Sequence, residues 1–175
     1  IQAELEASQL TLHVYDCYRP QRAVNDFIAW SKVPSEKAMK AEFYPRVDKA
    51  LFFKLGYVAR KSGHTRGSTV DLTIERAPPR DAAPYKPGES LVSCIAPWFA
   101  RYHDGTLDMG TGFDCMDELS HPGADVGHIA GTHREQLKSE MNKYGFVGIT
   151  EEWWHFTLAN EPFPATYFDF PITRE

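Results

Sequence analysis

Cysteine is scarce in this sequence, and neither a long hydrophobic run nor an excess of positive charge occurs in it. The three cysteines include no close-set pair of the kind that binds structural zinc through thiolates. No window approaches the roughly 20 apolar residues of a transmembrane helix, so we expect no membrane span. The 19 basic and 24 acidic residues give a net charge of −5, which argues against nucleic acid as a partner.

The positions of the cysteines leave two interpretations open. Cys94 and Cys115 flank a loop-rich stretch, and a disulfide between them would suit an oxidising compartment while leaving Cys17 unpaired. Free, buried thiols in a cytosolic protein fit the same count. The cysteines alone therefore do not decide the compartment.

The composition is typical of one globular domain, since 42% of the 175 residues are hydrophobic and 13% are aromatic. A chain of this size buries about 70% of the surface that its unfolded form exposes, so neither a disulfide nor a metal ion is needed merely to hold it together. We therefore treat residues 1–175 as a single domain. The spacing of Ile1, Leu5 and Leu10 predicts the end of a helix already under way, and we expect a missing N-terminal segment of the same protein before it.

Hydrophobic periodicity and turn residues predict both strands and helices. In chain order they are a strand at 10–18, helices at 20–31 and 36–55, a strand at 69–75, a short helix at 98–102, a helix at 132–144 and strands at 146–149 and 155–158. A proline-rich loop at 77–88 and the segment 162–175 show no regular period. The pattern predicts an α+β fold, an antiparallel sheet with helices packed on one side.

Three details of these elements are specific enough to be tested by a structure. Alternation in the first strand places four side chains on one side, those of Leu10, Leu12, Val14 and Asp16. The helix at 36–55 is interrupted at Pro45 and ends at Gly56. Residues 132–135 fit a capping box that opens the last helix, and Gly145 ends it.

A polar segment from Ser62 to Asp71 contains residues that a hydrophobic core does not need. It places His64 in a glycine-flanked loop and Asp71 inside the apolar strand that follows. A carboxylate in a buried strand must be paired, hydrogen-bonded or bound to a metal ion. A lone histidine such as His64 is more often a hydrogen-bonding loop residue than a ligand, so both interpretations remain open for it.

A second polar segment, 151–156, sets Glu152 and His155 among aromatic residues. Two histidines and a carboxylate, here His64, His155 and Asp71, suit catalytic zinc because three protein ligands leave one position for water. Glu152 could take the proton of that water and return it to a leaving amine. Positions three apart face opposite sides of a regular strand, so Glu152 and His155 can share an ion only where the backbone is bulged or looped.

Simpler interpretations exist for several polar and aromatic residues. Asp16 and Arg19, at a strand-to-helix corner, form either a structural ion pair or part of a site. Trp153 and Trp154 are expected in the core and the pocket wall. The remaining histidines have no partner at a persuasive spacing, and they are His13, His103, His121, His128 and His133.

Four blocks of the sequence resemble the zinc-dependent D-alanyl-D-alanine dipeptidases of the vancomycin-resistance type. The blocks are 14–21 with Tyr18-Arg19-Pro20, 62–73, 108–121 with Asp108-Met109-Gly110 and Phe113-Asp114, and 145–156 with Glu152-Trp153-Trp154-His155. They span most of the chain in the order of the family. A histidine-to-aspartate block that is followed far downstream by Glu-Trp-Trp-His is a specific combination.

The resemblance implies a metal centre and two groups that act on the reaction. It implies that His64, Asp71 and His155 bind one zinc ion per chain. It also implies that Glu152 is the general base and that Arg19 stabilises the charge of the tetrahedral intermediate.

The resemblance further implies a substrate pocket and an activity. Ser62 and Asp114 correspond to pocket residues, and Asp114 would hold the ammonium group of a small dipeptide. The implied reaction is the hydrolysis of D-Ala-D-Ala to two D-alanines by metal-activated water. Two alternatives share these residues: a D,D-carboxypeptidase or endopeptidase of the same zinc class acting on peptidoglycan stems, and a zinc-stabilised binding domain without turnover. A binding domain would not need an unliganded base such as Glu152.

Two features depart from the family. Its N-terminal region, which contributes a strand and a substrate-contacting tyrosine, has no counterpart in this chain. The proline-rich loop with Trp98 and Cys94 is longer than in the compact cytosolic members, and a pairing of Cys94 with Cys115 would suit an envelope protein. We therefore expect a periplasmic location, with the cytoplasm as the alternative.

Overall fold

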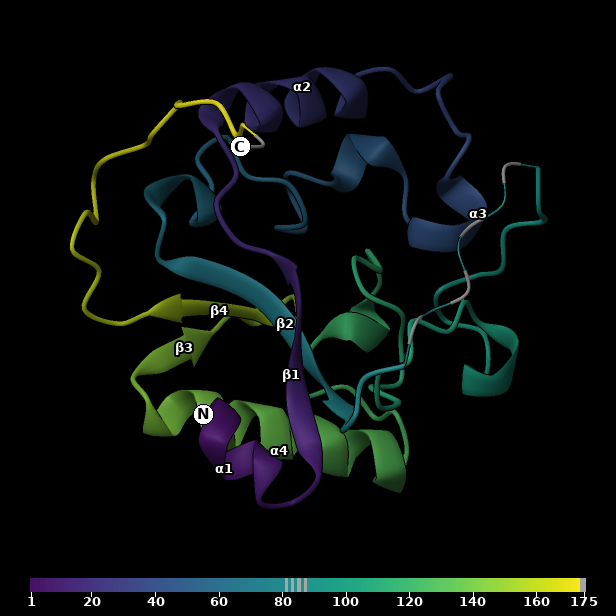
Figure 1. The fold of residues 1–175 in the computed structure, drawn as a ribbon. Coiled ribbons are helices and arrows are strands. Elements are labelled where there is room, and N and C mark those ends of the chain that lie inside the picture. Colours follow the sequence, from purple (N-terminus) through teal and green to yellow (C-terminus); the bar gives the residue numbers. More distant parts are fainter. Residues whose placement is uncertain (81, 83, 85, 87, 174–175) are drawn as a thin grey trace.

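The computed structural model of the chain describes residues 1–80, 82, 84, 86 and 88–173. Its strands are β1 (Leu10–Asp16), β2 (Thr69–Arg76), β3 (Phe146–Gly148) and β4 (His155–Leu158), and they form an antiparallel sheet in the order β1-β2-β4-β3 (Figure 1). Its α-helices are α1 (Gln2–Glu6), α2 (Gln21–Ser31), α3 (Lys40–Phe43) and α4 (His128–Lys143). Short 3-10 turns lie at Lys49–Leu51, His64–Arg66, Trp98–Ala100 and Glu118–Ser120. The predicted α+β fold is confirmed.

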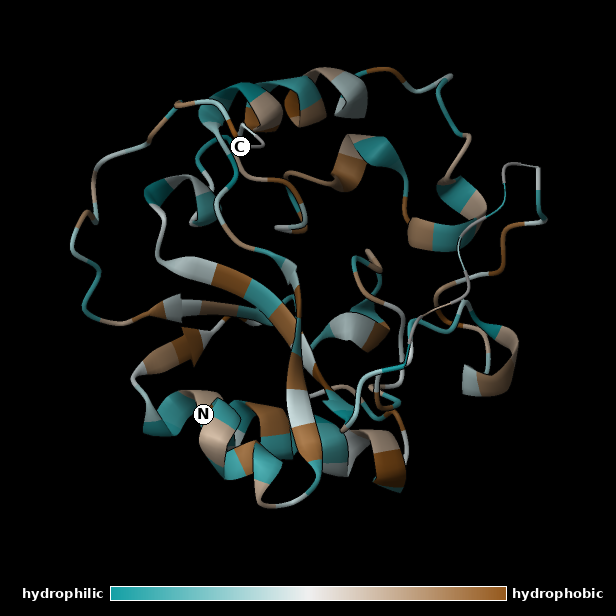
Figure 2. Cartoon of the chain, viewed as in Figure 1, coloured by the Kyte–Doolittle hydropathy of each residue, from teal (hydrophilic) through white to brown (hydrophobic). Residues whose placement is uncertain are grey.

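Alternation along β2 separates an apolar face of the sheet from a polar one. Leu72 and Ile74 are 3% and 0% exposed and belong to a core with Trp154 and Phe156. Because successive side chains of a strand point to opposite faces, Asp71 lies on the other side. Figure 2 shows the resulting change between hydrophobic and hydrophilic positions along the strands.

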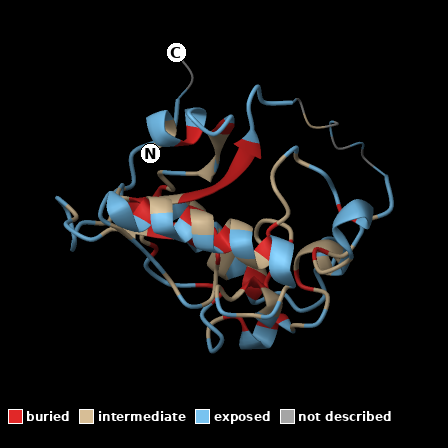
Figure 3. Cartoon of the chain, turned by 90° about the horizontal axis from the view of Figure 1, so that it is seen from below, coloured by how far each residue is buried: buried red, intermediate tan, exposed pale blue. Residues whose placement is uncertain are grey.

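Helices α1 and α4 cover the apolar face of the sheet. Leu5 of α1 and Leu137 and Met141 of α4 belong to the same core as the strand residues. Leu137 and Met141 are four positions apart and therefore share one side of the helix. Figure 3 shows buried positions that recur along α4 between exposed ones. These two helices are the layer that the sequence predicts on one side of the sheet.

The start of α4 differs from the prediction, whereas its end agrees. The helix begins at His128, and its N-cap residue, Gly127, makes no side-chain capping hydrogen bond. The predicted capping box at 132–135 is wrong, because Thr132 lies one turn inside the helix and donates its hydroxyl to the carbonyl of His128 over 2.9 Å. The helix ends at Lys143, and Gly145 follows at a φ of +81°, which favours glycine.

A bulge in β1 overturns the predicted alternation of that strand. Val14 pairs with Leu72 of β2, but Asp16 pairs with the next position, Asp71, so two residues of β1 oppose one of β2. The extra residue moves Asp16 away from the side that Leu10 occupies. The prediction that these two side chains share a side is therefore wrong.

The predicted helix at 36–55 is replaced by two short pieces, α3 and the turn Lys49–Leu51. Pro45 lacks an amide hydrogen and disfavours the helical conformation at the residue before it, so α3 ends at Phe43. The segment instead supplies Tyr44 and Phe52 to a second apolar cluster, against which Phe27 of α2 packs.

The remaining predictions concern irregular segments. The described positions within 77–88 and 162–173 contain no helix or strand beyond a turn, while positions 81, 83, 85, 87, 174 and 175 lie outside the described residues. A short helical turn occupies Trp98–Ala100, as predicted. Within the described part of the chain, no helix is both long enough and apolar enough to cross a membrane.

Candidate metal centre and substrate cavity

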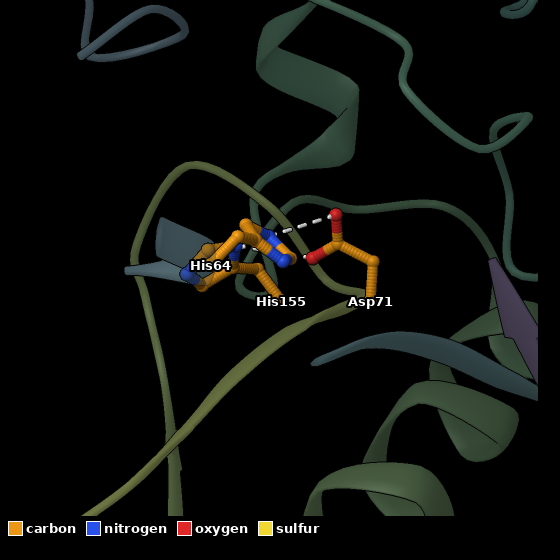
Figure 4. A group of neighbouring side chains, drawn as sticks. All are labelled: His64, Asp71 and His155. Carbon is orange, nitrogen blue, oxygen red and sulfur yellow. Dashed lines mark ion pairs between the residues drawn. The ribbon is translucent and has the colours of Figure 1, made fainter. Parts of the chain in front are cut away.

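Three side chains that are distant in the sequence converge on the polar face of the sheet. Asp71 of β2 and His155 of β4 are directly paired across the two strands, and His64 comes from the 3-10 turn just before β2. Their ligand atoms all lie within 4.8 Å of one another. Asp71 Oδ2 is 3.1 Å from His64 Nε2, and Asp71 Oδ1 is 3.0 Å from His155 Nδ1 (Figure 4).

The surroundings of His64 leave one of its ring nitrogens available. His64 is 1% exposed, and its Nδ1 lies 2.7 Å from the carbonyl oxygen of Cys17. A carbonyl only accepts, so Nδ1 carries the hydrogen and Nε2 carries a lone pair. His64 Nε2 and Asp71 Oδ1 are both buried, and despite the short distances to Asp71 Oδ2 and His155 Nδ1 neither atom has a partner in hydrogen-bond geometry. Buried polar atoms normally have partners, and a cation between them would satisfy both.

Gly63 permits the close approach of the His64 turn to the sheet. A Cβ atom at this position would lie 2.4 Å from the hydroxyl oxygen of Thr69, which is closer than real Cβ atoms come to any neighbour. The turn is also closed by a bond from the His64 amide to the hydroxyl of Ser62, 3.3 Å long. Gly63, one of the glycines that flank His64 in the sequence, is thus required because a side chain would clash with Thr69.

The surroundings of Asp71 favour its ionised form. Burial disfavours its charged form, but its contacts with His155 and His64 outweigh burial and lower its pKa below the ordinary value. A carboxylate that stays negative between two imidazoles is suited to holding a cation. The three residues could therefore hold a metal ion.

Glu152 reaches the same centre from a turn between β3 and β4. Its Oε2 is 3.5 Å from His155 Nδ1. Residues 149–154 are not part of a strand, which removes the geometric objection that positions three apart face opposite sides. The turn is fixed where Trp153 donates its amide to the carbonyl of Ser120 over 3.0 Å and Trp154 accepts from the amide of Leu72 over 3.1 Å. Both tryptophans are buried in the core.

Glu152 is held in an environment that favours its protonated form. Burial raises its pKa well above the ordinary value, and the neighbouring carboxylates of Asp114 and Asp71 raise it further. A carboxyl group with a raised pKa can both accept and return a proton near neutral pH.

Arg19 is clamped by Asp16 at the corner that follows β1. Its Nε and Nη2 donate to the same oxygen, Asp16 Oδ2, over 2.9 and 2.7 Å. Nη2 is also 3.9 Å from Asp71 Oδ2. The bulge in β1 places Asp16 opposite Asp71 and so brings the guanidinium to the edge of the metal centre. The ion pair that was one of two interpretations is present, and it lies within the site.

A cavity of about 400 Å³ joins these groups. All seven residues predicted for the site line it, namely Arg19, Ser62, His64, Asp71, Asp114, Glu152 and His155. We call it the central cavity. Its lining contains the carboxyl groups of Asp71, Asp114 and Glu152 and the guanidinium of Arg19. This excess of acidic groups favours cationic ligands.

Asp114 adopts an unusual backbone conformation in this cavity. Its φ is +59°, in the left-handed region that residues other than glycine seldom adopt. Burial raises its pKa to about 6, and the charge of Asp71 contributes in the same direction. A partly buried carboxylate of this kind gains from a cationic ligand.

The apolar wall of the central cavity was not predicted as part of the site. Phe27 and Val24 of α2 line it, although their spacing indicates only a buried helix face. Tyr57 lines it as well, with its hydroxyl 3.4 Å from His121 Nε2, and burial raises the pKa of Tyr57 to about 12. No sequence pattern marked Tyr57. The five histidines set aside on spacing do not line this cavity.

Cys94 and Cys115 form a disulfide, with a Cα–Cα distance of 5.7 Å, and Cys17 is exposed and unpaired. The pairing of Cys94 with Cys115 is therefore the one that the first interpretation of the cysteine positions expects. It also joins the loop before the 3-10 turn at Trp98–Ala100 to the segment that carries Asp114.

Comparison with known proteins places these features in a family. The family model described as D-ala-D-ala dipeptidase, Peptidase M15, matches residues 1–80 and 93–173. A D-alanyl-D-alanine dipeptidase of Streptomyces coelicolor is 42% identical over 165 residues, which are 92% of this chain and 68% of that protein. Dipeptidases of the same name from Enterococcus faecium and Enterococcus faecalis are 37% and 34% identical, over 97% and 98% of this chain and 73% and 75% of their own lengths. The chain belongs to the D-Ala-D-Ala dipeptidase family of metallopeptidases.

Proposed function

We propose that this protein is a zinc-dependent dipeptidase that hydrolyses D-Ala-D-Ala to two molecules of D-alanine. Membership of the family supports the reaction class. The observation that carries the proposal is the convergence of His64, Asp71 and His155 in one cavity with Glu152 and Asp114. A metal centre, a base and an ammonium-binding carboxylate are the parts that this reaction needs.

The donor set supports zinc as the metal. Two imidazoles and one carboxylate are ligands that zinc accepts, whereas calcium and magnesium prefer sets made of oxygen atoms. When bound, zinc supplies a Lewis acid that makes water acidic enough to lose a proton near neutral pH. The orphaned Nε2 of His64 and Oδ1 of Asp71 are the atoms that such an ion would satisfy.

Glu152 moves the proton in this proposal. Its carboxylate takes a proton from the attacking water and gives it to the amine that leaves when the peptide bond breaks. The distance of 3.5 Å from Glu152 Oε2 to His155 Nδ1 places the carboxylate at the metal centre. Its raised pKa makes the carboxylate a stronger base, which suits a group that takes up a proton and holds it until the amine leaves.

Arg19 stabilises the negative charge that develops on the carbonyl oxygen of the substrate. The two bonds from Arg19 to Asp16 hold the guanidinium in one orientation, so little reorganisation is needed when the charge appears. A fixed donor of this kind contributes about 3 kcal/mol to lowering the barrier.

Asp114 selects substrates with a free amino end. An ammonium group satisfies its carboxylate, while an internal peptide bond offers no cation to do so. The hydroxyl of Ser62, which already accepts the His64 amide, is a further polar group in the cavity for the dipeptide. These features support a preference for dipeptides over longer chains.

We also propose that the protein works in an oxidising compartment such as the periplasm. The Cys94–Cys115 disulfide supports this location, because structural disulfides persist outside the reducing cytosol. Alkylation of free thiols in intact cells tests the proposal. Labelling of Cys17 alone is the expected result, and labelling of all three cysteines would contradict it.

A substrate comparison tests the proposed reaction. The zinc-loaded protein is assayed with D-Ala-D-Ala, with L-Ala-L-Ala and with a peptidoglycan pentapeptide stem that ends in D-Ala-D-Ala. We expect the highest kcat/KM with free D-Ala-D-Ala. A higher kcat/KM with the stem would instead assign a carboxypeptidase, and the absence of zinc-dependent hydrolysis would remove the enzymatic role.

A further inference from the structure

Asp114 keeps its place without help from its own side chain. In the part of the chain that the structure describes, its carboxylate makes no hydrogen bond and no ion pair, although it lines the central cavity. Its backbone φ of +59° is one that persists only where the surroundings impose it. Apart from the electrostatic attraction of Arg19 and His64, the position of the carboxylate therefore depends on the main chain on either side of it.

Cys94 holds that main chain at two points. Its carbonyl accepts the amide of Gly112 over 2.9 Å, two residues before Asp114. Its sulfur forms the disulfide with Cys115, the residue immediately after Asp114. The two attachments bracket the carboxylate, and the covalent one is the closer of the two.

Cys94 is itself well anchored. Its amide donates to the carbonyl of Glu42 at the end of α3 over 2.9 Å. Its carbonyl also accepts from Nη1 of the buried Arg101, whose Nη2 donates to Asp108 over 2.6 Å. Cys94 and Cys115 are 4% and 0% exposed. A displacement of Cys115 relative to this anchor would require the disulfide to open.

We propose that the Cys94–Cys115 disulfide positions Asp114 for recognition of the free amino group of the dipeptide. The inference rests on the proposed function, because it assigns a task to a residue of the same site. The disulfide is a positioning element, since neither sulfur lines the central cavity. Its effect is on substrate recognition, because the metal ligands and Glu152 lie on other elements.

The remaining contacts limit the size of the effect. Without the disulfide, Phe113 still stacks on Tyr15 with the ring centroids 4.0 Å apart, and Met116 still donates to the carbonyl of Phe43 over 2.8 Å. Asp114 therefore shifts and gains freedom but stays in the cavity. Misplacement of a binding group by about 1 Å can lower activity by up to about 100-fold, so a partial shift corresponds to a change of about tenfold.

The test compares the wild type with the double variant Cys94→Ala/Cys115→Ala, both loaded with one zinc ion. D-Ala-D-Ala is compared with N-acetyl-D-Ala-D-Ala, which lacks the ammonium group. We expect the variant to have a KM for D-Ala-D-Ala about tenfold higher, a kcat within about threefold and a preference over the acetylated dipeptide about tenfold smaller. An unchanged KM and an unchanged preference would overturn the inference.

A double-mutant cycle separates positioning from a general loss of stability. In an Asp114→Asn background, opening the disulfide is expected to change KM by less than about twofold, because the group that it positions is already removed. A full tenfold effect in that background would overturn the inference. Leu137→Ala is the matched control, since it removes a fully buried core side chain of α4 that lies away from the cavity and is expected to leave KM unchanged.

Reduction of the folded protein provides the measurement if the double variant does not fold. A phosphine reduces the disulfide to two thiols by donating two electrons and is itself oxidised to the phosphine oxide. Water supplies the oxygen atom of that oxide and the two protons of the thiols. Zinc content and far-UV circular dichroism are recorded on the same sample. A raised KM in the reduced, zinc-loaded protein supports the inference, and an unchanged KM overturns it.

The outcomes also separate this inference from the proposed function. If the oxidised wild type hydrolyses no D-Ala-D-Ala, the proposed function fails and the inference fails with it. If the oxidised wild type is active and opening the disulfide leaves KM and amino-group preference unchanged, the inference alone fails.

Discussion

His155 faces Asp71 directly across β4 and β2, and the two side chains approach to 3.0 Å between Nδ1 and Oδ1. Cross-strand partners point to the same face of a sheet, so this pairing aims both groups into the central cavity. Phe156, the next residue of β4, points to the core on the other face. The metal centre is thus built on paired strands whose opposite face is closed by α1 and α4, a rigid support for ligands.

Removal of the proposed base tests the assignment of Glu152. Glu152→Gln keeps the size of the side chain but cannot accept a proton, and we expect kcat for D-Ala-D-Ala to fall about 1,000-fold. Zinc binding should persist, because the three ligands are unchanged. Turnover near the wild-type level with zinc still bound would show that another group moves the proton.

Arg19→Ala tests the stabilisation of the substrate oxygen. We expect kcat to fall by about 100-fold to 1,000-fold, with a smaller change in KM, because the guanidinium acts mainly on charge that develops during the reaction. Arg22→Ala is the matched control, since Arg22 lies on α2 and pairs with the exposed Asp169 outside the cavity. Equal losses in both variants would contradict a specific role for Arg19.

The pKa of Asp114 predicts a pH dependence of stability in the metal-free protein. Its pKa is about 6 in the folded state, against about 3.9 in an unfolded chain. The folded state binds the proton more tightly, so this group lowers stability as the pH rises from about 4 to 6, and the penalty is complete above that window.

Asp114→Asn removes that penalty. At pH 7.5 the free energy of unfolding of the metal-free variant should exceed that of the wild type by on the order of 2 kcal/mol, and at pH 4 the two should agree. Urea unfolding at both pH values measures the difference. A variant that is equally stable or less stable than the wild type at pH 7.5 would contradict the burial of a charged Asp114.

Gly63→Ala tests the link between packing and metal affinity. The added Cβ would meet the Thr69 hydroxyl at 2.4 Å, so the turn that carries His64 must move. We expect zinc affinity to fall by about 10-fold to 100-fold, as when the support of a ligand is lost. Gly131→Ala in α4 meets no atom within 4 Å and is the control, with zinc affinity unchanged in a competition titration against a chromophoric chelator.

The chemical character of the site could be predicted from single positions in the sequence. Asp71 stands out because a carboxylate inside an apolar strand needs a partner, and His155 stands out at the start of another strand. The end of α4 at Gly145 follows from the same local reasoning. These predictions depend on a residue and its immediate neighbours, which the sequence displays directly.

The relative placement of the elements could not be predicted in this way. The bulge that brings Asp16 opposite Asp71 depends on pairing between β1 and β2, and no local pattern marks the extra residue. The helix predicted at 36–55 does not form over that length, and Tyr44 and Phe52 instead fill a second apolar cluster, which depends on tertiary packing. Tyr57 reaches the cavity wall through the same tertiary packing.

An anomalous-scattering experiment at the zinc edge, on crystals of protein grown with zinc, tests the central claim most directly. The account predicts one strong peak per chain, at about 2.0–2.2 Å from a nitrogen of His64, a nitrogen of His155 and an oxygen of Asp71. A map with no peak among these three side chains, or with its only peak elsewhere, would contradict the account.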